Sequence, residues 1–168
     1  MTRNKVNLDE LRARAKGHLD EARHWFGQAI RAYDQMGDSR FVLAARSDLG
    51  HALRRGGALD EAEAVYRETI HEWQHVGNLG AIANQLEGFG YIAIARGDAI
   101  RAAHLLGAAE ATRVRGEAPG PPNEGVEHEA AIESLRTLID VQALDDAWAT
   151  GRRLALDEAV SLARSEAR

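Results

Sequence analysis

The chain has 168 residues, 45% of them hydrophobic, and a formal net charge of −5 with no cysteine. This length allows one domain or one repeat array with an appendage, while the acidic balance argues against a general grip on nucleic-acid phosphates. Without cysteine there are no disulfides or thiolate metal sites, and without a long apolar run or leader we expect a cytoplasmic protein that does not enter membranes.

A short first helix is expected from Leu8 to Lys16, because Asn7 and Glu10 have the spacing of a capping box. It should end at Gly17. The apolar residues of this helix are few, which leaves two interpretations. Either the N-terminal edge continues into earlier repeats or pairs with a second copy as a homodimer, or the helix is a modest cap.

A forty-residue unit then recurs along the chain. Its landmarks are three glycines, three alanines and three large apolar residues at equal spacing: Gly17, Gly57, Gly97; Ala22, Ala62, Ala102; Phe26, Tyr66, Leu106. Apolar residues at three- and four-residue steps predict helices over 18–36, 40–55, 59–76, 79–95 and 99–114. Such short connections favour antiparallel neighbours, and a repeat of this size is typical of a helical solenoid. The helical spacing places Trp25, Trp73 and Trp148 in the core.

All three prolines lie in residues 118–123, which we interpret as a linker that ends the array. Residues 124–168 have lost the period and should form a C-terminal helical cap. Helices are expected over 124–139, 143–150 and 156–163, with Gly151 separating the last two.

The order of landmarks around Gly50 and Gly90 resembles the tetratricopeptide repeat, although that repeat usually has a period of about 34. The two runs are Leu49-Gly50, Gly57, Ala62, Tyr66 and Phe89-Gly90, Gly97, Ala102, Leu106. The resemblance implies an all-α, right-handed superhelix of antiparallel helix pairs with a C-terminal helical cap. Residues 1–117 would hold the repeats, at about 8–36, 40–76 and 79–114.

Two further stretches, 103–110 and 147–160, resemble the C-terminal sensor region of bacterial LuxR-type and signal-transduction ATPase transcriptional regulators. The resemblance implies a non-catalytic sensor or protein-interaction module, a C-terminal part of such a regulator. Its partner would be a protein, a peptide or an effector, with no cofactor.

In tetratricopeptide arrays the first helix of each pair lines a concave groove. Carried onto this chain, the groove positions are Ser47, His51, Arg54, Asn84, Glu87 and Tyr91, flanked by Ala44 and Ile94. His51 and Arg54 could hold a carboxylate or phosphate, and Tyr91 offers an aromatic platform. The alternative is that all of them are ordinary solvated residues on a helix face.

Two other motifs in the sequence would imply other functions. His71-Glu72-Trp73-Gln74-His75 has the H-E-x-x-H form of a zinc hydrolase, but its register is already explained by Trp73 facing the core. The last three helices could form a DNA-binding helix-turn-helix, although Asp157 and Glu158 would repel phosphates there. Because the phosphate-binding loop and the nucleophile elbow are missing from the sequence, we expect neither an enzyme nor a metal site.

Overall fold

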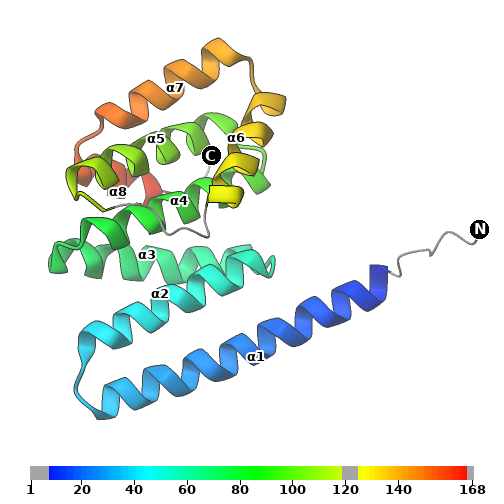
Figure 1. The fold of residues 1–168 in the computed structure, drawn as a ribbon, viewed down its shortest axis with the longest axis vertical. Helices are drawn as coiled ribbons and strands as arrows, with labels where there is room; N and C mark the ends of the chain where they lie inside the picture. The colour runs from blue at the N-terminus through cyan, green and yellow to red at the C-terminus, as the bar shows by residue number, and fades with distance from the viewer. Residues whose placement is uncertain (1–7, 119–124, 166–168) are drawn as a thin grey trace, which may run out of the picture. The chain divides into compact units, whose positions relative to one another are not determined.

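The computed structural model describes residues 8–118 and 125–165, with side chains from Gly17 onward. These residues form eight α-helices and no strand, which confirms the all-α prediction (Figure 1). None of the described helices is long and apolar enough to cross a bilayer. The bounds are α1 Leu8–Gln35, α2 Ser39–Arg55, α3 Leu59–Val76, α4 Leu79–Ala95, α5 Ala99–Arg115, α6 Gly125–Leu138, α7 Val141–Arg153 and α8 Leu156–Arg164.

The first five helices end in the same turn, repeated every twenty residues. Four of these turns have glycine at positive φ, namely Gly37, Gly57, Gly77 and Gly97, at 71° to 84°. In each, the following N–H donates to the carbonyl five residues earlier at 2.9–3.2 Å, as from Asp98 to Ala93. This bond satisfies a carbonyl that the helix end would leave open, and only glycine adopts the left-handed turn without strain. The fifth turn has Glu117 at φ 47°.

The residue after the turn glycine is also the N-cap of the next helix. The side chains of Asp38, Asn78 and Asp98 each accept a hydrogen bond from the backbone N–H three residues on, at 3.0–3.2 Å. One glycine and one capping side chain therefore end one helix and start the next without a loop. The corresponding residue before α3 is Ala58, whose side chain has no acceptor.

Replacing Ala58 with Asn should supply this missing cap. We expect the free energy of unfolding to rise by about 0.5–1 kcal/mol, because one open N–H at the start of α3 gains an acceptor. Urea unfolding followed by circular dichroism measures the change. The reverse variant, Asn78→Ala, should lose a similar amount, and equal stability of wild type and both variants would contradict the capping argument.

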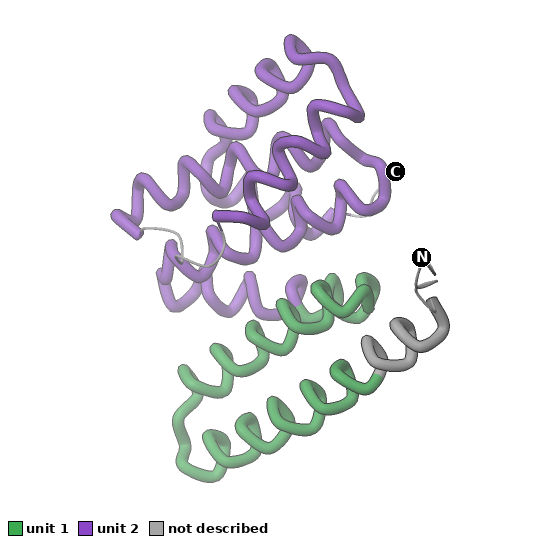
Figure 2. Tube along the Cα trace, turned by 45° about the vertical axis from the view of Figure 1, so that its right-hand side comes forward, with its two compact units in different colours: residues 1–65 green, residues 66–168 purple. Residues whose placement is uncertain are grey.

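The chain divides into two compact units, residues 1–65 and 66–168, and the division falls within α3 (Figure 2). The boundary predicted from sequence, a linker at 118–123 between the repeats and the cap, stays a prediction, and residues 119–123 lie outside the described part of the chain. In the first unit α1 packs against α2. Arg23 donates to Asp20 and to Glu61, each at 2.9 Å, on the surface of this unit.

Two expectations for α1 are wrong. The helix continues without a break through Gly17, since one glycine lowers helix stability by only about 1 kcal/mol relative to alanine. Trp25 is 69% exposed, and its ring makes an edge contact with the His24 ring. Helical spacing places Trp25 at the edge of the apolar face of α1. The spacing alone does not show which edge of that face another helix covers. The predicted cap at Asn7 lies outside the described residues.

In the second unit, α5 contacts both α4 and α7 and lies between them (Figure 1). On the α4 side, a side chain at Gly90 would come within 2.9 Å of Leu106 and 3.6 Å of the Ala102 carbonyl. The small residues that mark the repeat therefore let the two helices approach closely. Trp73 is buried, as expected, with 5% of its surface exposed.

On the α7 side, α5 makes an even closer crossing through two glycines. A side chain at Gly107 would overlap the Trp148 carbonyl, and one at Gly151 would overlap the His104 carbonyl. Gly151 was predicted to separate two helices, yet α7 continues through it to Arg153. The prediction was wrong because glycine at this position allows two backbones to touch and does not end the helix.

Gly151→Ala should destabilise the second unit, because the new methyl group cannot be accommodated by moving a side chain. We expect a loss of about 1–3 kcal/mol in the free energy of unfolding. Gly27→Ala is the matched control, since its nearest neighbour is the flexible Arg31 side chain at 3.6 Å. Thermal unfolding should show the control unchanged or more stable. A Gly151→Ala variant as stable as wild type would contradict the close crossing.

Candidate functional site

The six predicted groove residues lie in two separate units. Ser47, His51 and Arg54 belong to α2 in the first unit, and Asn84, Glu87 and Tyr91 to α4 in the second. On α2, Ser47 and Arg54 are buried and His51 is half-buried. The Ser47 hydroxyl donates to the Leu43 carbonyl at 3.0 Å, so its hydrogen is used inside the helix.

On α4, Asn84 and Glu87 are brought together by a residue that sequence reasoning missed. Arg113 of α5 donates to both carboxylate oxygens of Glu87 at 2.8 and 2.6 Å and to the side-chain oxygen of Asn84 at 2.6 Å. The side chains of Arg113 and Glu87 are only 14% and 10% exposed. This two-point pairing fixes the guanidinium plane and ties α5 to α4. A search for opposite charges on the two helices joined at Gly97 could have found it.

Glu87→Gln should lower the free energy of unfolding by about 1–3 kcal/mol, because it leaves a largely buried guanidinium without its anion. The double variant Glu87→Gln, Arg113→Met should recover part of this loss. Glu133→Gln is the control, since Glu133 and Arg136 form a pair whose side chains are 71% and 59% exposed. Its effect should stay within about 0.5 kcal/mol. If the double variant recovered none of the lost free energy of unfolding, the broken ion pair would not be the source of the loss.

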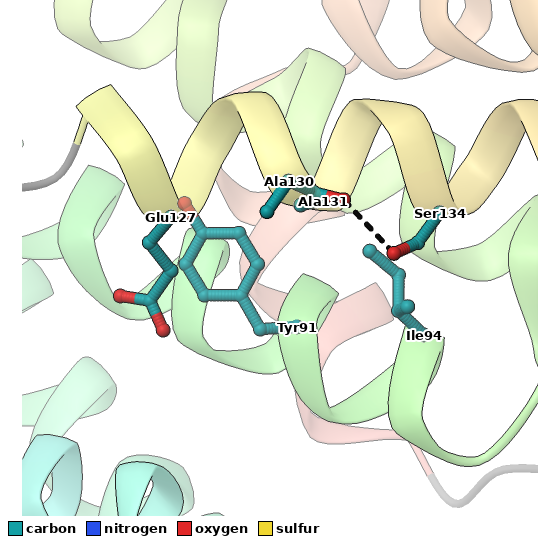
Figure 3. Close-up of a pocket in the computed structure, with 6 residues that line it drawn as sticks. All are labelled: Tyr91, Ile94, Glu127, Ala130, Ala131 and Ser134. Carbon is teal, nitrogen blue, oxygen red and sulfur yellow. Dashed lines mark hydrogen bonds between the residues drawn. The ribbon is translucent and has the colours of Figure 1, made fainter. Parts of the chain in front are cut away.

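Tyr91, the third predicted residue of α4, lines a small pocket between α4 and α6. The pocket has a volume of about 180 Å³ and is lined by Tyr91, Ile94, Glu127, Ala130, Ala131 and Ser134. Figure 3 shows the Tyr91 ring beneath α6, with Glu127 beside the ring and Ser134 near Ile94 at the opposite end. The lining is mostly apolar, and Glu127 contributes its carboxylate.

The pocket exists because α6 faces α4 with small side chains. Ala131 and Leu135 are the buried residues of α6 and hold it in the core that α4, α5 and α7 share. At the neighbouring positions Ala130 and Ser134 are too small to fill the space above Tyr91 and Ile94. No repeat signal marks these α6 residues, so sequence reasoning did not find them.

The cap that positions α6 is fixed by polar contacts on the opposite side of α5. The Trp148 indole N–H donates to Glu110 at 2.6 Å, and the same carboxyl group lies 3.8 Å from Arg152. Trp148 also makes an edge contact with His128 of α6, at a ring-centroid distance of 6.0 Å. Trp148 is thus half-buried and links three helices.

The histidines of the H-E-x-x-H motif contact each other. Their ring centroids are 4.4 Å apart and nearly perpendicular, and Nδ1 of His75 lies 2.8 Å from the His71 carbonyl oxygen. Zinc in a hydrolase needs three protein ligands. Within residues 17–118 and 125–165, no group of three or more histidine, cysteine or acidic residues is placed to hold a metal ion.

The carboxylates at the start of α8 accept hydrogen bonds from other residues of the second unit. Glu158 accepts from the Ala155 N–H at 2.8 Å, and Asp157 accepts from Gln74 at 2.6 Å. At the other end of α8, Arg101 donates to the Ala163 carbonyl at 3.1 Å and to the Ser165 carbonyl at 2.8 Å. A guanidinium on the last carbonyls complements the helix dipole. The helix is therefore tied down at both ends, whereas a recognition helix must present its N-terminal turn to DNA.

Among the described residues, Asp48 and His104 have a pKa that departs from its ordinary value. Partial desolvation raises the pKa of the Asp48 carboxyl group. Partial burial lowers the pKa of His104, and the negative charge of Asp98 offsets some of this shift by raising it. Neither residue lines the pocket, so neither is placed to exchange a proton with a ligand there.

Comparison of the chain with models of protein families, with curated proteins and with solved structures finds no match.

Proposed function

We propose that this chain is a non-catalytic protein-interaction module that binds a peptide or protein segment at the α4 and α6 face of its second unit. The observation that carries the proposal is the pocket above Tyr91 and Ile94. Both residues stand on the face of α4 that the tetratricopeptide resemblance assigns to partner binding. In this proposal the helices form a right-handed superhelix of antiparallel pairs.

The repeated turns support a scaffold of this kind. Each of the first five helices is fixed at its C-terminal end by the same hydrogen bond, and three of the helices that follow a turn begin with a side-chain cap. Helices joined without flexible loops hold their surface residues at constant spacing. A surface of that kind suits a ligand that is itself extended or helical.

The link to bacterial transcriptional regulators rests on two stretches, 103–110 and 147–160. These stretches contain the two glycines of the α5 and α7 crossing and pack against each other there. They also contain Glu110 and Trp148, which are hydrogen-bonded to each other. Both stretches that carry the resemblance therefore lie at one structural feature, the contact between the C-terminal cap and the last repeat helix, α5. In a regulator, a partner bound beside this cap would bias a neighbouring switch domain.

The lining of the pocket supports binding more than catalysis. Ser134 donates its hydroxyl hydrogen to the Ala130 carbonyl at 2.9 Å, and the carboxylate of Glu127, the one acidic residue of the lining, lies at the opposite end of the pocket (Figure 3). A nucleophilic hydroxyl needs an adjacent base and an orienting group.

The proposal is tested by selecting binders from a displayed random-peptide library and measuring their affinity by fluorescence anisotropy. Ala130 is exposed, so a tryptophan at this position can fill the pocket without disturbing the core. Ala130→Trp should lower the affinity of the selected peptides at least tenfold. Ala64→Trp, at an exposed alanine of α3, is the matched control and should leave affinity unchanged. Circular dichroism confirms that both variants fold. Failure to select any peptide, or equal binding to Ala130→Trp, would overturn the proposed function.

A further inference from the structure

We propose that the pocket between α4 and α6 receives a primary ammonium group on an aliphatic stem, as in the side chain of a lysine from a basic peptide. The inference rests on the proposed function and names the chemistry of its ligand. It follows from the size of the pocket, from the character of each wall and from the charge around it.

The size of the pocket fits one side chain. Pockets for drug-sized molecules measure about 300–1,000 Å³, whereas a cavity of about 150 Å³ holds a single benzene ring. The volume of about 180 Å³ is close to the second value. The pocket is an open depression, which is too small for a whole metabolite but large enough for one long side chain of a larger partner to lie in.

The apolar walls suit a methylene stem. Ala130 and Ala131 provide aliphatic surface from α6, and Ile94 and the Tyr91 ring provide apolar surface from α4 (Figure 3). Lysine combines such a stem with a compact charged head, and the stem gains from contact with apolar surface.

The polar features of the lining are electron-rich. Glu127 contributes a carboxylate, and an aromatic ring attracts a cation over its face. The hydroxyl hydrogen of Ser134 is donated to the Ala130 carbonyl, which leaves the oxygen lone pairs of Ser134 as acceptors. The six lining residues include no lysine, arginine or histidine. An ammonium group is thus favoured, and a carboxylate or phosphate would be repelled.

The surroundings add to this preference. Residues 66–168 carry 16 acidic against 10 basic side chains, whereas residues 1–65 carry 10 against 11. The acidic excess of the chain therefore belongs to the unit that contains the pocket. Within α6 itself there are three acidic residues, Glu127, Glu129 and Glu133, against the single Arg136. A basic segment would be steered toward this face by the net charge.

The test is a titration of the full chain with N-acetyl-lysine methylamide, followed by NMR at the methyl groups of Ala130 and Ala131. The neutral comparison is N-acetyl-norleucine methylamide, which has the same stem without the charge. We expect the lysine compound to bind about tenfold more tightly, and the difference to shrink as salt is added. Absence of lysine binding, or equal binding of the two compounds, would overturn the inference.

The matched variants are Glu127→Gln and Glu129→Gln, which remove the same charge from α6 inside and outside the pocket. Glu127→Gln should abolish the preference for lysine, and Glu129→Gln should keep most of it. An equal effect of both would mean that only the general acidity of the unit matters, which contradicts a built ammonium site. If selected peptides need the pocket but are not basic and ignore Glu127→Gln, the inference fails while the proposed function stands.

Discussion

The architecture depends on one hydrogen bond that is made five times. At the end of each of the first five helices, a residue at positive φ turns the chain, and the next N–H returns to a carbonyl five residues back. At the first four turns the residue that donates this bond directly precedes the next helix, so one helix ends and the next begins within three residues. Because the turns recur every twenty residues, α2 to α5 each have 17 or 18 residues, and the small residues at the crossings recur in register. The close contact of Gly90 with Leu106 is a consequence of that register.

The parts of the fold that the sequence predicts well are those with local causes. Glycine followed by Asp or Asn marks a turn with a cap, and apolar residues at helical spacing mark the helices, so the ranges of α2 to α5 follow from pattern alone. Glycines without that context were misread. Gly17 lies inside a continuous helix, and Gly151 serves a backbone contact with a residue 47 positions earlier in the chain. A contact so distant in sequence leaves no periodic trace.

The candidate site also has residues that the sequence predicts and residues that it does not. Tyr91 could be proposed because it lies on a helix whose register was known, but its neighbours on α6 follow from how the cap packs. The partner of Glu87 was missed for another reason. Arg113 stands forty residues after Trp73, so a repeat alignment places an arginine where an apolar core residue is expected. One repeat has a buried tryptophan at this position and the next has a two-point ion pair.

The tight turns also decide how such a chain can change in length. A helix fixed at both ends, by a glycine turn and by a capping side chain, has no loop in which an added residue could be absorbed. One inserted residue would rotate every following side chain by about 100°, carrying alanines out of the crossing and larger residues into it. Duplication of forty residues would instead preserve every phase relation. Growth by whole modules is therefore the tolerated path, and single-residue insertions in these helices should be rare among descendants of this sequence.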